Sequence, residues 1–171
     1  MLNSGHHINF FYGNKFFLPK DNKTRPALFL DRDGVIIKEK HFISKASEVE
    51  LENGMNDLID LANVLKLPIV IITNQSGIAR KFTKWDDYFQ VTEKMLNLLN
   101  ADNTVIAIYA NGLGEESPNY SWRKPSPSMI LNAANYLKLD LSKSFLIGDR
   151  LSDLTSGLNA GLLNLFHVRT G

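Results

Sequence analysis

Short apolar segments alternate with segments of helical periodicity from residue 26 to the end of the chain. The runs at 27–30 and 69–72 are too short for a buried helix and have the apolar composition of buried strands. Further strands are predicted at 104–110, 144–147 and 162–168. Strands that alternate with helices are joined by right-handed crossovers, which leaves the strands parallel and the sheet covered on both faces. We therefore expect an α/β fold with a Rossmann-like parallel sheet and helices on both faces.

The predicted helices separate these strands and show apolar residues three and four positions apart. They cover about 54–66, 84–99, 128–138 and 151–159. Residues 1–25 precede the alternation and are interpreted as an N-terminal extension, in which 8–12 and 15–18 could pair as a short hairpin around Gly13-Asn14. The remaining residues, 26–171, are long enough for one compact domain with its own core.

Composition excludes several classes of protein. Lys+Arg 19 against Asp+Glu 18 gives a net charge of +1, which does not favour a protein bound to nucleic acid through a large basic surface. The absence of cysteine excludes disulfides, thiolate metal sites and a cysteine nucleophile. No apolar run reaches the ~18 residues needed to span a bilayer, and the N-terminus lacks the apolar stretch of a signal peptide. We expect a cytoplasmic monomer with no membrane partner.

Polar side chains follow three of the predicted strands, and ligands of parallel α/β sheets bind beyond these carboxyl ends. Each segment alone has an ordinary structural explanation, such as an Asp-Gly turn, a helix cap or an exposed pair of bases. Together they supply carboxylates for Mg²⁺, a hydroxyl and amides for a phosphoryl group, and one cation, which favours phosphoryl transfer. The candidates in chain order are Asp31 and Asp33, Thr73 and Asn74, Arg123 and Lys124, and Asp149 and Asp153.

In their order these residues resemble the four motifs of the haloacid dehalogenase-like (HAD) phosphohydrolases. Asp31-x-Asp33-Gly34 resembles the first motif, Thr73 the second, Lys124 the third, and Gly148-Asp149-x-x-x-Asp153 the fourth. The strings Asp-Arg-Asp-Gly-Val-Ile, Thr-Asn-Gln-Ser-Gly-Ile-Ala-Arg and Arg-Lys-Pro are similar to those of the D-glycero-D-manno-heptose 1,7-bisphosphate phosphatase and histidinol-phosphatase branch. The resemblance covers most of 27–171 and implies a domain with no cap or a very small one.

The resemblance implies hydrolysis in two steps. Asp31 would attack phosphorus and form an aspartyl-phosphate. Asp33 would protonate the leaving oxygen and then activate the water that cleaves this intermediate. Asp31, the backbone carbonyl of Asp33 and Asp149 would hold Mg²⁺.

Other residues would bind the phosphate and the rest of the substrate, again by resemblance. Thr73 and the Asn74 amide would hold phosphoryl oxygens, and Lys124 would neutralise the phosphate and Asp31. Asp153 would orient Lys124. The candidates for contact with the rest of the substrate are Arg123, Arg32 and His41, although an exposed loop histidine is an equally good interpretation of His41.

One loop departs from the branch. Relatives often carry a structural zinc held by cysteine and histidine before the Arg-Lys-Pro string, and the aligned positions here are Ala110, Gly112, Tyr120 and Trp122. None of these side chains is a thiolate or imidazole ligand, so we predict no zinc. Packing of Tyr120 and Trp122 would hold the loop instead.

The sequence thus predicts a Mg²⁺-dependent phosphatase of a small phosphorylated metabolite, foremost a sugar phosphate such as heptose 1,7-bisphosphate. Histidinol phosphate and a polynucleotide 3′-phosphate are alternative substrates. A receiver-like module that only accepts a phosphoryl group is an alternative of another class. Asp33 discriminates against it, because a paired second aspartate gives a phospho-enzyme the means to hydrolyse.

Overall fold

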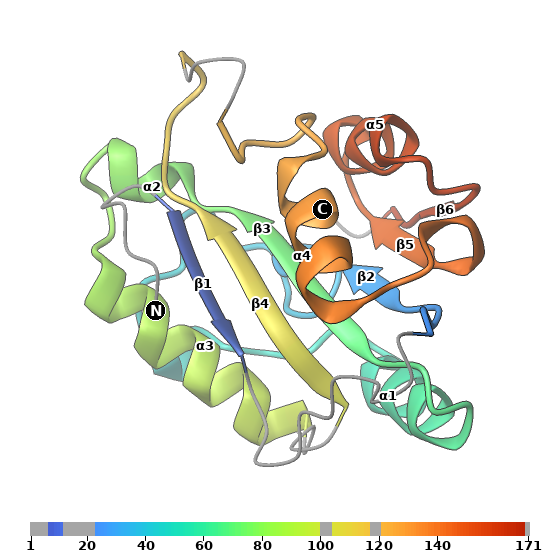
Figure 1. Ribbon diagram of the computed structural model, residues 1–171. Helices are drawn as coiled ribbons and strands as arrows, with labels where there is room; N and C mark the ends of the chain where they lie inside the picture. Colours follow the sequence, from blue (N-terminus) through green and yellow to red (C-terminus); the bar gives the residue numbers. More distant parts are fainter. Residues whose placement is uncertain (1–6, 12–22, 100–103, 117–120, 170–171) are drawn as a thin grey trace.

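The computed structural model describes residues 7–11, 23–99, 104–116 and 121–169. Within them, six strands form one sheet in the order β1-β4-β3-β2-β5-β6 (Figure 1). Neighbours from β4 to β6 are parallel, as the alternating pattern predicted. The parallel strands are β2 (Leu28–Leu30), β3 (Ile69–Asn74), β4 (Val105–Asn111), β5 (Phe145–Gly148) and β6 (Asn164–His167).

The N-terminal segment supplies an edge strand that the sequence did not predict as part of this sheet. β1 (His7–Phe11) pairs antiparallel with β4 over five residues, from His7 opposite Asn111 to Phe11 opposite Ala107. An antiparallel edge on an otherwise parallel sheet is common in α/β folds. The second half of the expected hairpin, 15–18, lies outside the described residues.

Helices cover both faces of the sheet and divide the core into two clusters (Figure 1). On one face, α1 (Met55–Val64) and α3 (Trp85–Leu99) bury Ile59, Val91 and Met95 against the strands. On the other face, α4 (Ser128–Leu137) and α5 (Leu151–Ala160) bury Met129 and Ala160. All four predicted helices are therefore present, with ends within about two residues of those expected from periodicity.

Short helical segments were not predicted from the sequence. They are α2 (Ser76–Ala79) and two 3₁₀ turns, η1 (Ala46–Glu48) and η2 (Leu141–Lys143). One turn of helix carries too few residues for a 3.6-residue apolar period to show. In the described part of the chain, no helix combines the length and apolar character that crossing a membrane requires.

The strand order fixes the place of the site. From β2 the chain adds β3 and β4 on one side, then returns to place β5 and β6 on the other. The carboxyl ends of β2, β3 and β5 therefore meet where the order reverses, which is the usual ligand site of such sheets. The register sets Leu30, Ile71 and Ile147 side by side, immediately before the polar residues predicted to carry the chemistry.

Candidate active site

A cavity of about 510 Å³ opens at the carboxyl ends of the central strands. It brings together residues from four separate parts of the chain. Its lining includes Asp31 and Asp33 after β2, Asn74 and Gln75 at the end of β3, Lys124 before α4, and Asp153 in α5. The sequence-predicted acids, amide and cation thus meet at one rim of the sheet.

Lys124 is the centre of a buried ionic cluster. Its side chain is 2% exposed, and Nζ lies 2.8 Å from Asp31 Oδ1 and 2.6 Å from Asp153 Oδ1. The third hydrogen of the ammonium group is donated to the carbonyl oxygen of Ile72 at 3.0 Å. Each of the three N–H donors of Lys124 has a partner, so the orientation of the ammonium group is fixed. The two carboxylates also favour its charged form.

Burial and neighbouring charges act in opposite directions on this cluster. Burial raises the pKa of Asp31 to about 7, even though Lys124 favours its ionised form. Burial by itself lowers the pKa of Lys124, but attraction to Asp31 and Asp153 outweighs burial and the pKa is raised. The lysine therefore stays charged, while Asp31 remains an acid whose ionised form needs further positive charge beside it.

Asp149 completes a set of oxygen ligands. Atoms of Asp31, Asp149 and Asp153 lie within 4.8 Å of one another, and Oδ1 of Asp149 is buried with no hydrogen-bond donor among the described residues. Burial, and then repulsion from Asp153, raises the pKa of Asp149. Clustered carboxylates with an unpartnered buried oxygen are the donors that Mg²⁺ requires, so these residues fit the predicted ion.

Two glycines make the close approach of these acids possible. A Cβ on Gly34 would lie 2.7 Å from Asp149 Oδ2, and Gly34 also has φ +80°, which side chains disfavour. A Cβ on Gly148 would lie 2.3 Å from the Cβ of Asp153. The glycines of the first and fourth motifs therefore leave room for the acids of this cluster.

Asp33 lies beside the cluster but is held by other partners. Its carboxylate accepts hydrogen bonds from the Arg32 guanidinium at 3.0 to 3.2 Å and from Gln75 Nε2 at 2.8 Å. Arg32 is 1% exposed and lies 5.0 Å from the ring centroid of Tyr88. Arg32, expected from the sequence to contact substrate, therefore has its guanidinium engaged within the protein.

Thr73 and Asn74 occupy the end of β3 as predicted. Thr73 is buried and its hydroxyl accepts a hydrogen bond from Gln75 Nε2 at 2.8 Å. The side-chain amide of Asn74 pairs with the backbone of Lys124, accepting from its N–H at 3.0 Å and donating to its carbonyl at 3.2 Å. The Asn74 side chain thus fixes the segment that carries the lysine.

Arginines surround the mouth of the cavity. Arg80, Arg123 and Arg150 line it, with Arg80 2.8 Å from Glu115 and Arg150 3.1 Å from Glu39. The arginine side chains of both pairs are exposed and such pairs contribute little to stability, so the guanidinium groups can exchange these partners for an anionic ligand.

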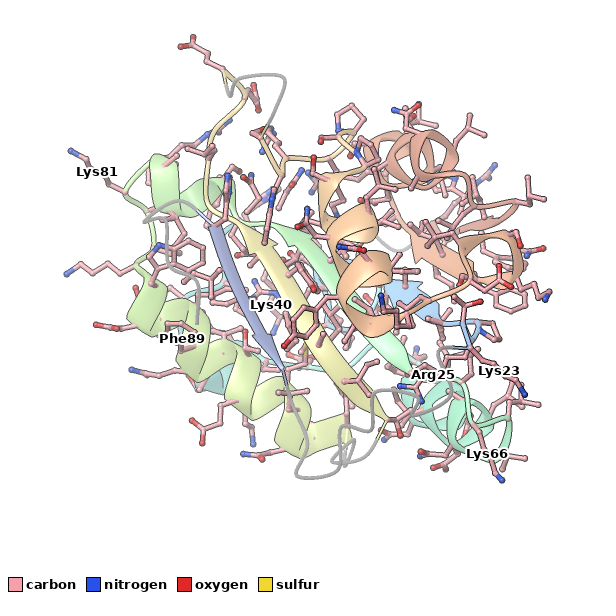
Figure 2. The ribbon with its side chains drawn as sticks, in the orientation of Figure 1. Lys23, Arg25, Lys40, Lys66, Lys81 and Phe89 are labelled. Carbon is pink, nitrogen blue, oxygen red and sulfur yellow. The ribbon has the colours of Figure 1, made fainter. Side chains whose placement is uncertain are left out.

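Of two further residues, His41 lines the cavity and Lys81 does not. His41 is an exposed residue with φ +38°. Lys81, next to Arg80 in the chain, is exposed and extends away from the body of the molecule (Figure 2).

The loop before Arg123 is held by aromatic packing at Trp122, as predicted. The Trp122 ring stacks on His7 of β1, with centroids 5.2 Å apart and planes 9° apart, and lies 5.5 Å from Tyr109 of β4. Tyr120, the other residue expected to hold this loop, lies outside the described residues. The edge strand β1 thus supports the segment that leads to Arg123 and Lys124.

Removing the Trp122 ring is expected to weaken this support. The substitution Trp122→Ala should lower the free energy of unfolding by about 2 kcal/mol, because it deletes a half-buried ring that packs on two others. Urea denaturation followed by circular dichroism measures the change. Trp122→Phe should lose less than half as much, and Tyr136→Ala, at a residue that is 54% exposed, should lose less than Trp122→Ala. Equal losses in all three variants would contradict the packing role.

Two residues of the site were not singled out in the sequence. Gln75 follows the predicted Thr-Asn pair, and Arg150 follows the predicted acid of the fourth motif. Sequence spacing carried no signal for either, because their partners Asp33 and Glu39 are 42 and 111 residues away. Only the folded chain shows these contacts.

Comparisons with known proteins agree with this geometry. The model of the HAD-hydrolase-like family matches residues 121–171, which include Lys124, Asp149 and Asp153. A D-glycero-beta-D-manno-heptose-1,7-bisphosphate 7-phosphatase of Helicobacter pylori is 37% identical over 147 residues, covering 82% of each chain. The same enzyme of Mesorhizobium japonicum is 38% identical over 144 residues, covering 80% of this chain and 66% of the relative, just under two thirds of its length.

A solved structure shares the fold. The crystal structure of D,D-heptose 1,7-bisphosphate phosphatase from B. bronchiseptica, complexed with magnesium and phosphate, superposes with a TM-score of 0.77 at 29% identity. The match covers 85% of this chain and 82% of that one. The similarity therefore extends over most of both chains rather than over the motifs alone.

Proposed function

We propose, on the premise that the chain belongs to the D-glycero-D-manno-heptose-1,7-bisphosphate 7-phosphatase family of HAD-like hydrolases, that it is a Mg²⁺-dependent phosphatase of a small sugar phosphate. Heptose 1,7-bisphosphate is the foremost candidate substrate, because relatives across most of the chain carry that name. The observation that carries the proposal is the convergence of Asp31, Asp149, Asp153 and Lys124 at one rim of the sheet.

Asp31 is the proposed nucleophile. The backbone N–H of Arg32 at 2.7 Å and Lys124 Nζ at 2.8 Å both reach Oδ1, and among the described residues none donates to Oδ2. In the first step, a carboxylate oxygen of Asp31 forms a bond to phosphorus while the bond from phosphorus to the leaving oxygen breaks. Asp33 gives its proton to that leaving oxygen.

The second step regenerates the enzyme. A water oxygen forms a bond to phosphorus, its proton passes to Asp33, and the bond from phosphorus to Asp31 breaks. Lys124 stabilises the negative charge that Asp31 and the phosphoryl group bring together. Thr73 and the backbone N–H of Asn74 hold phosphoryl oxygens, which restricts their motion during both steps.

Asp31, the backbone carbonyl of Asp33 and Asp149 would hold Mg²⁺ in this reaction. The ion supplies positive charge that reduces repulsion between the attacking carboxylate and the anionic phosphate. Asp153 Oδ1 is paired with Lys124 Nζ at 2.6 Å, so its proposed role is to orient the lysine.

Metal removal should abolish phosphate release. Treatment with EDTA is expected to reduce turnover to background and Mg²⁺ to restore it, because the ion would supply positive charge that reduces repulsion between Asp31 and the anionic phosphate. Elemental analysis of the purified protein should find no stoichiometric zinc, since no thiolate or imidazole ligand occurs at 110, 112, 120 and 122. Turnover that persists in EDTA would contradict the metal assignment.

A screen of phosphate release tests the proposed substrate class. The panel is heptose 1,7-bisphosphate, a hexose phosphate, histidinol phosphate, a nucleotide and a 3′-phosphorylated oligonucleotide, each with and without Mg²⁺. The proposal expects the largest kcat/KM with a sugar phosphate in Mg²⁺. Preference for histidinol phosphate or for the oligonucleotide would contradict the substrate class, and no release from any compound would contradict the activity.

Acetyl phosphate separates an enzyme from a module that only accepts a phosphoryl group. A phosphatase turns the compound over repeatedly, because Asp33 provides the general base for hydrolysis of the aspartyl-phosphate. One phosphoryl group retained per protein, without turnover, would favour the receiver-like alternative.

A further inference from the structure

The carboxylate of Asp33 is held from two sides by residues that the proposed mechanism does not use. The Arg32 Nε lies 3.2 Å from Oδ1 and 3.1 Å from Oδ2, and its Nη2 lies 3.0 Å from Oδ1. Gln75 Nε2 approaches Oδ2 from the end of β3 at 2.8 Å. Both carboxylate oxygens therefore accept hydrogen bonds, and the plane of the group is defined by its donors.

Gln75 is itself held in one orientation. Its Oε1 accepts from Arg32 Nη2 at 3.0 Å, while its Nε2 donates both to Asp33 and to the hydroxyl of Thr73 at 2.8 Å. Exchanging the two ends of the amide would place its N–H donors against the guanidinium and its oxygen against the carboxylate. The partners of Gln75 thus determine which end faces Asp33.

Arg32 is fixed by its burial and by its two neighbours. The side chain is 1% exposed, is paired with Asp33, and lies 5.0 Å from the ring centroid of Tyr88 in α3. Its backbone N–H donates to Asp31 Oδ1 at 2.7 Å. One residue therefore contacts both acids of the first motif, Asp31 through the backbone and Asp33 through the guanidinium.

We infer that Arg32 and Gln75 are positioning residues that hold the Asp33 carboxyl group in a fixed direction at the wall of the cavity for its part in the reaction. The inference rests on the proposed function, in which Asp33 gives a proton to the leaving oxygen and later takes one from water. The terminal torsion of an aspartate is soft, so an unsupported carboxyl group samples many directions. The observed contacts are those of the ionised group, so one of these donors must give way on the oxygen that carries the proton in the first step. Each proton transfer then requires the group within hydrogen-bond reach of the oxygen concerned.

Thr73 connects this arrangement to the phosphoryl group. Gln75 Nε2 reaches the Thr73 hydroxyl and Asp33 at the same distance of 2.8 Å. The residue that would hold a phosphoryl oxygen and the residue that would move the proton are therefore set relative to each other by one amide. A displacement of about 1 Å in such a group is enough to slow a reaction by roughly 10²-fold.

The leaving group provides the test. Hydrolysis of 4-nitrophenyl phosphate needs little help from a general acid, because 4-nitrophenolate is a stable anion, whereas an alkyl phosphate such as a hexose phosphate needs the proton. The variant Gln75→Ala should lower kcat/KM by about 10²-fold for the hexose phosphate and by less than about threefold for 4-nitrophenyl phosphate. The parameter kcat/KM is used because it reports the first chemical step.

The second step gives an independent readout. If the base is misplaced, hydrolysis of the aspartyl-phosphate slows, so Gln75→Ala should release a burst of 4-nitrophenol and accumulate phospho-enzyme that wild-type protein does not. Gln75→Glu, which places a carboxylate against Asp33, should be slower still with the hexose phosphate. Arg32→Lys should fall between the wild type and Gln75→Ala, because it keeps the charge but loses the planar fork.

Controls distinguish this inference from the proposed function. Gln90→Ala removes an exposed glutamine from α3 and should leave both substrates unchanged. Asp33→Asn should show the same dependence on leaving group as Gln75→Ala, with larger losses; if it does not, the proposed role of Asp33 is wrong. If Asp33→Asn shows that dependence and Gln75→Ala slows both substrates equally or neither, the positioning role alone is overturned. Urea denaturation confirms that each variant is folded.

Discussion

Replacing Asp31 with asparagine is expected to reduce phosphate release by about 10⁴-fold or more while the protein stays folded. The amide has nearly the shape of the carboxylate but is a poor nucleophile, and it cannot form the aspartyl-phosphate. It also removes a negative charge that would help to hold Mg²⁺. Trapping with a labelled sugar phosphate should give no covalent phospho-enzyme in the variant.

The fold should tolerate Asp31→Asn, and the pKa of the Asp31 carboxyl group gives the reason. Burial raises the pKa of Asp31 to about 7, so folding favours the neutral form of this acid more than the unfolded chain does. Between the ordinary pKa of an aspartate and pH 7, Asp31 binds more protons in the folded chain than in the unfolded chain. The free energy of unfolding therefore falls as pH rises through this range, because the side chain must ionise where it is buried. A neutral amide avoids that loss, so Asp31→Asn should unfold at the same urea concentration as wild type or higher.

Asp60→Asn provides the matched control for Asp31→Asn. Asp60 is exposed on α1 and the substitution should change neither activity nor unfolding. Wild-type phosphate release by Asp31→Asn would refute the nucleophile assignment, and loss of activity together with loss of the fold would refute the account of its burial.

Replacing Lys124 with methionine is expected to damage both stability and activity. The change removes the one cation within 4.0 Å of both Asp31 and Asp153 among the described residues and leaves two buried carboxylates together. Breaking a buried ion pair by removing one partner costs about 3–5 kcal/mol. Turnover should fall by about 10³-fold, because a preorganised charge at the phosphoryl group is lost.

A second substitution tests the cause of this loss. Lys124→Met combined with Asp153→Asn should recover part of the stability, since the double variant carries one fewer unpaired buried charge, but none of the activity. Lys143→Met, at a lysine that is 73% exposed and paired with Asp140 on the surface, should cost less than about 1 kcal/mol. Urea denaturation at neutral pH measures the free energy of unfolding of the wild type and of these three variants. Similar losses for Lys124→Met and Lys143→Met would contradict a buried ionic cluster.

The predictions from sequence were accurate where the signal is local. The apolar runs and the helical periods located β2 to β6 and the four longer helices, because burial on a fixed face imposes a pattern on consecutive residues. Lys124 and Asp153 were identified through the resemblance of their motifs, whereas Asp31 and Asp149 could be located for a related reason. Side chains that follow parallel strands meet at one edge whatever the lengths of the connections between the strands.

Only the tertiary structure decided how these residues contact one another. β1 forms an edge of the main sheet because the backbone groups on one side of β4 are available for pairing. No local sequence pattern indicates a pairing partner about a hundred residues away. Likewise, the guanidinium group of Arg32 points toward Asp33 and Gln75. Its buried positive charge is compensated by the carboxylate oxygen of Asp33 and the amide oxygen of Gln75. Periodicity and spacing specify which face or strand end a side chain occupies, whereas its hydrogen-bond partners depend on which distant segments the completed fold brings within reach.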